Sequence, residues 1–527
     1  MKRVLVSDAM APEVAEILGN APGIKVDVKT GLKPDELKAV IKDYDALIVR
    51  SSTRVTAEII EAAARLAAVG RAGAGVDNID IPAASKRGIV VMNTPGGNTV
   101  TTAEHAIAMM VSLARKIPQA TASMKAGLWE KSKFMGNEYC NKTLGVIGLG
   151  RVGAVVADRA MGLKMNVIAH DPFISPEVAE QMGVKLVSLD ELYAHSDFIT
   201  VHSPLSQETK NLVNADAFAK MKQGVFLIHC ARGGIVNEKA LYDALKSGKV
   251  AGAAIDVFEE EPTRNIDLIG LPNVICTPHL GASTDEAQTN VAIAIAHQIA
   301  AYFATGEIKG AVNFPSVSAD VMAVIRPFLD LAEKLGTFQA HLLTGALQEV
   351  TIEYSGELLN HNVVPVTVSL IKGLLEPILT ETVNFINAPV IARERGIRII
   401  EVKSSETKDY TNMIDLTVKT SKEISRTAGA VFGKNDLRIV RVNEFSVEIA
   451  PEGYMLAVSN EDTPGVIGNL GTTLGGNKVN IARLHLSRDA QARKALVVLN
   501  TDSPVASDVL DKLRKLPHVV SVTPIKM

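Results

Sequence analysis

The chain has 527 residues, 47% of them hydrophobic and 21% charged, which excludes a mostly disordered protein and predicts about three to four domains. The formal net charge of −3 gives a nucleic acid no general reason to bind, and the lack of a run of about 18 uncharged apolar residues predicts no membrane span. Three cysteines without CxxC spacing favour a reducing, cytoplasmic setting and predict neither a disulfide framework nor a metal site.

The first 97 residues alternate short apolar runs with helical patterns. We expect strands at 4–7, 24–28, 46–50, 67–70 and 89–92, and a helix at 57–68. Apolar runs without polar alternation are typical of parallel strands that helices cover on both faces. The turn-forming residues 93–97 interrupt this rhythm, and a long apolar helix follows at 101–115.

A second series of strands and helices follows. We expect its strands at 144–147, 166–169, 198–202, 226–229 and 251–256, and a long helix at 286–304. The position of this helix predicts that the chain crosses back to the first unit. The first domain would then be discontinuous, 1–97 plus 282–310, and residues 98–281 would form the second. The crossing segments 93–100 and 281–285 would flank a cleft and act as hinges.

The character of the sequence changes after Pro315. Residues 317–450 mix long helices with β-rich stretches at 347–354, 397–403 and 411–419, and they contain no catalytic cluster. The last part, 454–527, shows strands at 454–459, 478–487, 495–500 and 518–523, with helices that start near 465 and 505. This βαββαβ order is the ferredoxin-like arrangement.

A dinucleotide-binding pattern lies at the start of the second series. Gly148, Gly150 and Gly153 form GxGxxG after an apolar strand and open a helix, and Asp171 ends the following strand. Glycine lets the backbone approach a pyrophosphate, and the helix N-terminus supplies N–H donors. Asp171 would accept hydrogen bonds from ribose hydroxyls, which favours NAD over NADP. The alternative is a glycine-rich turn that binds no ligand.

Three chemically suited side chains lie near predicted strand ends in the same half: Arg232, Glu261 and His279. Oxidation of an alcohol needs a base for the hydroxyl proton, and histidine serves near neutral pH. A carboxylate on the other ring nitrogen would orient that histidine, and an arginine would hold a substrate carboxylate. Taken singly, each also fits a plain structural reading: a surface cation, a solvated acidic run and a strand cap.

These motifs resemble the D-isomer-specific 2-hydroxyacid dehydrogenase family over residues 1 to about 310. The resemblance implies two Rossmann-like or flavodoxin-like doubly wound domains around a cleft, a dimer through the cofactor domain, and the catalytic roles given to Arg232, Glu261 and His279. It implies NAD contacts, beside the glycines and Asp171, at Arg151, Val152, Ser203, Cys230, Ala231, Arg232, Asp256, His279, Leu280, Gly281 and Ala282.

The first unit would supply the substrate side of the cleft. Arg50 and Arg71 each come at or just after a predicted strand end, and Gly73 and Gly75 would leave backbone N–H groups free for a carboxylate. Asn98 would add a hydrogen bond. Two arginines for one small substrate indicate two anionic ends, such as a carboxylate and a phosphate. The alternative is a pair of ordinary interdomain salt bridges.

The whole chain resembles the long-form members of this family, in which an intervening domain and an ACT domain follow the catalytic core. This implies oxidation of 3-phospho-D-glycerate to 3-phosphohydroxypyruvate, the first step of L-serine synthesis, in a homo-oligomer, expected to be a tetramer. It also implies that L-serine binds between ACT domains of two subunits at Asn460, Asp462 and Asn480. Lys131 and Lys133 stand where relatives often carry arginine, so a substrate contact across a dimer stays open.

Other functions remain open from the sequence. Within the family, the alternative is a glyoxylate or hydroxypyruvate reductase. From another class, a core of this kind could be a non-catalytic NAD-sensing scaffold. The ACT domain could also serve oligomerisation alone.

Overall fold

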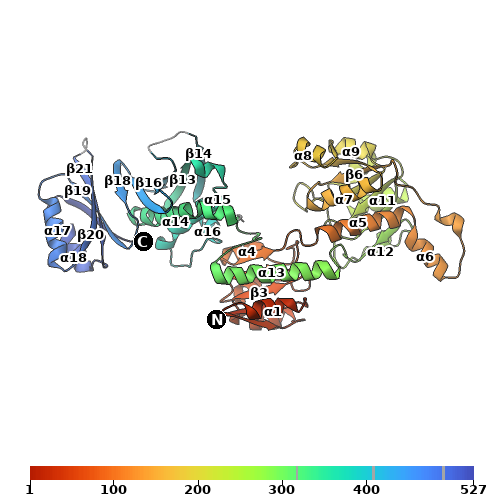
Figure 1. Cartoon of the computed structure of the whole chain (residues 1–527), viewed down its shortest axis with the longest axis horizontal. Coiled ribbons are helices and arrows are strands. Elements are labelled where there is room, and N and C mark those ends of the chain that lie inside the picture. Colours follow the sequence, from red (N-terminus) through yellow and green to blue (C-terminus); the bar gives the residue numbers. More distant parts are fainter. Residues whose placement is uncertain (316–318, 406–409, 490–492) are drawn as a thin grey trace.

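The computed structural model of the chain describes residues 1–315, 319–405, 410–489 and 493–527. These residues form four β-sheets that follow one another along the chain. In Figure 1 the third and fourth sheets lie on one side of the first sheet and the second sheet lies on the other. Two parallel, doubly wound sheets are followed by a mixed sheet and a four-stranded antiparallel sheet, which confirms the expected fold class. The expected start of the third part falls on residues 316–318, outside the described residues.

The first sheet is parallel throughout, with the order β2-β1-β3-β4-β5. Its strands are β1 (Lys2–Val6), β2 (Ile24–Val28), β3 (Ala46–Val49), β4 (Ala68–Arg71) and β5 (Val90–Asn93), and its helices are α1 (Glu13–Asn20), α2 (Pro34–Val40), α3 (Ala57–Ala62), α4 (Ile81–Lys86) and α13 (Asp285–Thr305). Successive side chains point to opposite faces, so Val4 packs with α1 and α13, whereas Leu5 packs with α2, α3 and α4. Helix α13 therefore returns to the first sheet after the second sheet is complete (Figure 1).

The second sheet is also parallel, with the order β12-β11-β10-β9-β6-β7-β8. Its strands are β6 (Thr143–Ile147), β7 (Asn166–His170), β8 (Lys185–Leu186), β9 (Phe198–Val201), β10 (Val225–His229), β11 (Val250–Ile255) and β12 (Val274–Cys276). Its helices are α5 (Thr99–Ala114), α6 (Ile117–Lys125), α7 (Arg151–Gly162), α8 (Pro176–Gln181), α9 (Leu189–His195), α10 (Ala215–Lys220), α11 (Glu238–Lys246) and α12 (Ile266–Ile269). The strand order reverses at β6, and the crevice at such a reversal is where doubly wound sheets bind ligands.

The third sheet has the order β14-β13-β15-β16-β17-β18, in which only β13 and β14 pair in parallel. Its elements are α14 (Ala319–Leu342), β13 (Leu347–Ser355), α15 (Val364–Leu375), α16 (Ala388–Glu394), β14 (Arg398–Ser404), β15 (Met413–Thr420), β16 (Ile424–Phe432), β17 (Asp436–Val442) and β18 (Phe445–Ile449). Helices α14 and α15 pack together, and buried side chains of both belong to one core with the sheet.

The fourth sheet has the order β20-β21-β19-β22, as expected for the βαββαβ arrangement. Its elements are β19 (Tyr454–Glu461), α17 (Val466–Gly476), β20 (Ile481–Asp489), β21 (Lys494–Thr501), α18 (Ser507–Arg514) and β22 (Val519–Lys526). One face packs against α17 and α18, whereas Met455, Val498 and Ile525 on the other face join the core of the third part. The central strands β21 and β19 are therefore covered on both faces, whereas the edge strand β20 stays largely exposed.

The expected helix at 57–68 is wrong in its second half, because α3 ends at Ala62. The chain turns there since Arg65 forms an ion pair with Asp45 at 3.1 Å and the Ala67 N–H donates to the Asp45 carbonyl oxygen. These contacts lead the chain into β4 despite the helix propensity of alanine. The sequence analysis also missed β8, β12 and the three antiparallel strands β16–β18. No helix among the described residues is long and apolar enough to cross a bilayer.

Candidate active site

A cavity of about 410 Å³ lies between the first and second sheets, at the carboxyl ends of their strands. Residues that follow β3, β4, β10, β11 and β12 line it together. Of the predicted catalytic and substrate-binding residues, the cavity wall contains Arg50, Arg71, Gly73, Asn98, Arg232, Glu261 and His279. Side chains that are far apart in the sequence therefore meet at one site.

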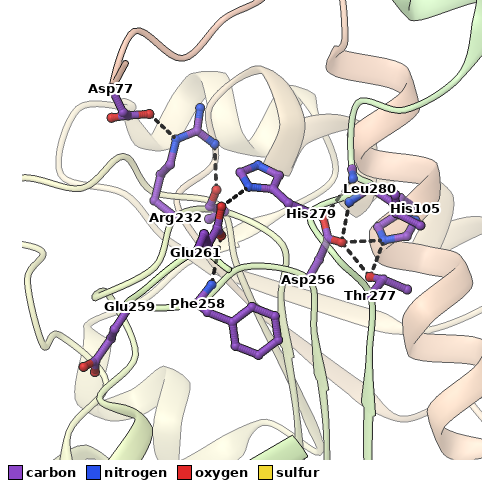
Figure 2. A network of polar contacts seen from close by, with 12 residues as sticks. Asp77, His105, Arg232, Asp256, Phe258, Glu259, Glu261, Thr277, His279 and Leu280 are labelled. Atoms are coloured by element: carbon purple, nitrogen blue, oxygen red, sulfur yellow. Dashed lines mark hydrogen bonds and ion pairs between the residues drawn. The ribbon is translucent and has the colours of Figure 1, made fainter. Parts of the chain in front are cut away.

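The His279 ring is oriented by Glu261. Its Nδ1 lies 2.7 Å from Glu261 Oε2, and the other carboxylate oxygen accepts a hydrogen bond from the Phe258 N–H at 3.1 Å (Figure 2). A carboxylate can only accept, so Nδ1 carries a hydrogen, and in the neutral ring Nε2 is the free acceptor. The His279 side chain is 45% exposed, so a substrate can reach it. This tautomer suits a base that takes a proton at Nε2.

The loop that carries His279 is held by Asp256, which directly follows β11. The backbone N–H of His279 donates to the Asp256 carbonyl oxygen at 3.0 Å, the Leu280 N–H to Oδ1 at 2.7 Å and the Gly281 N–H to Oδ2 at 2.8 Å. One residue thus binds three successive amides. His279 has φ of 56°, a left-handed conformation that a residue with a Cβ adopts only when its surroundings hold it there.

The Asp256 carboxylate is buried yet ionised. Burial alone would raise its pKa, but hydrogen bonds from His105, Thr277 and the Leu280 N–H together lower the pKa below its usual value. His105 lies on the long apolar helix that the sequence predicts at 101–115, and the structure places it beside this carboxylate. The apolar spacing around His105 gave no signal of that contact, because the partner is about 150 residues away in the chain.

Arg232 connects the two sides of the cleft. Its Nε lies 3.4 Å from Asp77 Oδ2, which belongs to the loop after β4, and its Nη1 donates to the Ala231 carbonyl oxygen at 2.7 Å (Figure 2). A Cβ at Gly75 would come within 2.6 Å of Arg232 Nη2, so a larger residue here would displace the guanidinium. The sequence analysis assigned no role to Asp77, which fixes the guanidinium from the opposite unit.

Arg71 makes the cavity strongly positive. Burial first, and then the charges of Arg232 and Arg50, lower its pKa from the usual value, so three guanidinium groups share a small space. Arg71 Nη1 donates to the Ala72 carbonyl oxygen at 2.6 Å, and its buried Nε has no hydrogen-bond partner among the described residues. Such a set of cations favours an anionic ligand that would satisfy these donors.

The expectation that the Gly73 N–H is free is wrong. It donates to Thr94 Oγ1 at 2.8 Å, because the segment after β5 lies against the loop after β4. Gly73 still lines the cavity and has φ of 138°. A Cβ there would lie 1.7 Å from Arg71 Nη1, so glycine at this position leaves space for the arginine side chain.

The glycine-rich loop has the shape that a pyrophosphate needs. Gly148 has φ of 93°, and a Cβ on it would meet Ser203 Oγ at 2.8 Å, whereas a Cβ on Gly153 would meet the Gly148 oxygen at 2.0 Å. Gly150, which precedes the first residue of α7, has nothing within 4 Å of its Cβ direction. Two glycines therefore allow the tight turn and close packing, and the third leaves open space at a helix N-terminus.

Asp171 is fixed next to this loop. Its Oδ2 accepts from the Leu149 N–H at 2.8 Å and its Oδ1 from the Phe173 N–H at 2.9 Å, which leaves further lone pairs for ribose hydroxyls. Of the other expected NAD contacts, Cys230, Asp256, Gly281 and Ala282 line the same cavity as His279 and Arg232. Burial raises the pKa of the Cys230 thiol, which stays protonated. Arg151, Val152, Ser203, Ala231 and Leu280 are not part of that wall.

Comparison with known proteins shows which family this chain belongs to. Family models match three successive parts of the chain: "D-isomer specific 2-hydroxyacid dehydrogenase, NAD binding domain" at residues 107–281, "D-3-phosphoglycerate dehydrogenase intervening domain" at 324–443 and "ACT domain" at 454–518. The D-3-phosphoglycerate dehydrogenase of Archaeoglobus fulgidus is 46% identical over 100% of both chains. The chain belongs to the D-3-phosphoglycerate dehydrogenase family. The Bacillus subtilis member is 40% identical over 99% of both chains.

Solved structures resemble the catalytic core of this family member. A glyoxylate reductase from Paecilomyes thermophila is 30% identical, covers 59% of this chain and 98% of its own, and has a TM-score of 0.54. A D-lactate dehydrogenase from Aquifex aeolicus, complexed with NAD and lactic acid, is 28% identical, covers 60% and 100%, and has a TM-score of 0.52. The family match confirms the predicted resemblance, and the chain is an NAD-dependent D-2-hydroxyacid dehydrogenase.

The predicted effector residues do not meet within one chain. Asn460 and Asp462 lie at one end of the fourth sheet. Asn480 directly precedes Ile481, the first residue of β20, which pairs with Thr501. Thr501 in turn pairs with Tyr454, at the other end of β19. Asn460 is six steps along β19 from Tyr454, which corresponds to a distance of about 20 Å along the strand. Lys131 and Lys133 lie on the short 3-10 helix Lys131–Phe134, away from the cavity wall, and Lys133 pairs with Glu130.

Because the space beside Gly150 is open, a substitution there should weaken NAD binding with little effect on folding. Gly150→Val should lower the thermal unfolding midpoint by no more than about a few degrees, because φ of −68° suits valine and no neighbour lies within 4 Å, although valine is a poorer N-cap than glycine. It should weaken NADH binding by at least about tenfold, since the side chain takes the space of the pyrophosphate. Fluorescence titration with NADH measures this. Gly162→Val, at the other end of α7, is the matched control, and equal NADH affinity of the two variants would contradict the assignment.

Proposed function

We propose that this family member oxidises 3-phospho-D-glycerate to 3-phosphohydroxypyruvate with NAD, the first step of L-serine synthesis. The observation that carries the proposal is the convergence of three guanidinium groups on the cavity that contains the His279–Glu261 pair. A substrate with a carboxylate at one end and a phosphate at the other matches that charge. A short 2-hydroxy acid with a single anionic end would leave cationic groups uncompensated.

We assign the roles from the contacts of each side chain. Arg232, steadied by Asp77, holds the substrate carboxylate and the C2 oxygen, while Arg50 and Arg71 bind the anionic ends. His279 Nε2 takes the C2 hydroxyl proton, and Glu261 stabilises the imidazolium that forms. NAD supplies the acceptor for the C2 hydride; Gly150, Asp171 and the start of α7 would hold its pyrophosphate and ribose.

We further propose that the protein is a homotetramer in the cytoplasm. We also propose the domain limits expected from the sequence, with hinges at residues 93–100 and 281–285. The three cysteines of the chain are free thiols, which suits a reducing compartment. The dimer contact through the cofactor domain would cover exposed apolar side chains near α6, including Trp129 at 81% exposure and Met135 at 77%.

Initial rates of NADH consumption test the substrate. The protein should use 3-phosphohydroxypyruvate better than hydroxypyruvate by at least about tenfold in kcat/KM, because one charge-assisted hydrogen bond contributes about 1.5–3 kcal/mol. Equal or better use of hydroxypyruvate would replace this assignment with a hydroxypyruvate or glyoxylate reductase. NADH binding without turnover of either acid would instead favour a non-catalytic scaffold.

His279→Ala tests the base. We expect kcat to fall by at least about 100-fold, the usual contribution of a general base, while NADH still binds. His195→Ala is the matched control, because His195 is exposed at the end of α9 in the same unit. Glu261→Gln should show a smaller loss, since its amide oxygen still accepts from Nδ1 but carries no charge. Near-normal turnover by His279→Ala would remove this residue from the mechanism.

We propose that L-serine regulates the enzyme at a site between two ACT domains. Asn460 is buried, and its Oδ1 has no hydrogen-bond partner within the described part of the chain, so it can accept from an ammonium group. Asp462 forms a 3.2 Å ion pair with Arg488 and would exchange part of that pairing for the ligand. Because Asn480 lies at the other end of the sheet, it can complete the site only from a second copy.

Co-expression of two differently tagged chains tests this arrangement. Asn460→Ala and Asn480→Ala should each abolish inhibition by L-serine in the homo-oligomer, whereas the mixed oligomer should regain it in part. In a mixed dimer, one subunit keeps Asn460 and the other keeps Asn480. Two-fold symmetry then leaves one of the two sites with both asparagines and the other site with neither. Wild-type activity that is unchanged at millimolar L-serine would leave the ACT domain an oligomerising role. Inhibition of wild type but not of the mixed oligomer would place both residues in one subunit's site.

A further inference from the structure

His105 lies directly behind the loop that carries His279. It belongs to α5, and its side chain is 19% exposed. Its Nε2 is 3.2 Å from Thr277 Oγ1 and 3.3 Å from Asp256 Oδ1 (Figure 2). The same helix lines the substrate cavity one turn earlier, at Thr102, and begins next to Asn98 at the crossing between the two units. His105 thus joins the cleft helix to the catalytic loop.

The direction of the hydrogen bonds around His105 follows from counting protons. Thr277 has one hydroxyl hydrogen, and this donates to Asp256 Oδ1 at 2.6 Å. The ionised carboxylate has no hydrogen to give. Nε2 therefore cannot accept from either neighbour and must itself carry a hydrogen. The ring acts here as a donor toward Thr277 Oγ1 and Asp256 Oδ1.

This donor completes the set around Asp256. The carboxylate also receives the Thr277 hydroxyl and the N–H groups of Leu280 and Gly281. A buried carboxylate with too few donors would protonate or turn toward water, and either change would release the two amides. Because those amides directly follow His279, their release would let its left-handed backbone relax and move the ring away from Glu261.

We propose that His105 is a positioning residue for the oxidation reaction, which holds His279 in place through Asp256 and Thr277. This inference rests on the proposed role of His279 as the base. A positioning residue acts on the chemical step more than on substrate binding, because Arg50, Arg71 and Arg232 bind the substrate from other loops. The contribution comes from the N–H donor, so a side chain that supplies a donor at the same place should substitute for the ring.

Two variants of similar size separate the donor from the space that the ring fills. His105→Leu fills the space without a donor, and His105→Gln supplies an amide N–H. We expect kcat of His105→Leu to fall by about tenfold or more, as small displacements of reacting groups do, with the KM for 3-phosphohydroxypyruvate changed less than about threefold. His105→Gln should keep kcat within about threefold of wild type. Glu104→Ala, exposed on the same helix, should behave as wild type.

The pattern of results decides the inference. Equal kcat in wild type and His105→Leu would overturn it, and so would an equal loss in His105→Leu and His105→Gln, since the donor would then not matter. A rise in KM without a fall in kcat would also overturn it and would place His105 in substrate binding. Failure of the proposed function is distinct, because wild type would then not turn over the acid or His279→Ala would stay active.

Discussion

The site depends on how one buried carboxylate is compensated. Asp256 directly follows β11, where the parallel sheet ends, and it binds three consecutive amides of the loop after β12 through its carbonyl and carboxylate oxygens. That loop contains His279, whose backbone is left-handed and whose ring meets Glu261. The parallel order of β10, β11 and β12 brings these segments to one sheet edge. The buried charge thereby fixes the position of His279, the candidate base.

The second organising feature is the imbalance of charge in the cavity. Arg50, Arg71 and Arg232 converge there, and burial together with the charges of the other two lowers the pKa of Arg71 from its usual value. Asp77 reduces the electrostatic repulsion among these arginines, because it pairs with Arg232 across the cleft. An anionic substrate would neutralise the remaining charge, so the cavity favours a ligand with anionic groups.

In the C-terminal half, packed side chains and polar contacts connect the ACT domain to the first unit through the intervening domain. One face of the fourth sheet shares a core with the intervening domain, through Met455, Val498 and Ile525. The intervening domain in turn touches the first unit at an ion pair between Lys86 and Glu394 and at the hydrogen bond from Asn384 Nδ2 to the Gly88 oxygen. The predicted effector residues lie at opposite ends of the sheet, which makes oligomerisation part of the proposed regulation.

The sequence by itself determined what depends on local pattern: two parallel sheets, the βαββαβ ending and the glycine-rich loop at residues 148–153. It also predicted the candidate catalytic side chains. These follow from apolar runs, turn residues and helix starts, each set within a few residues. Only the tertiary structure decided that His105 faces Asp256, that Asp77 pairs with Arg232, that Thr94 takes the Gly73 N–H and that α3 stops at Ala62. Each of these outcomes is fixed by a partner 20 to about 150 residues away, and such a partner leaves no mark on local spacing.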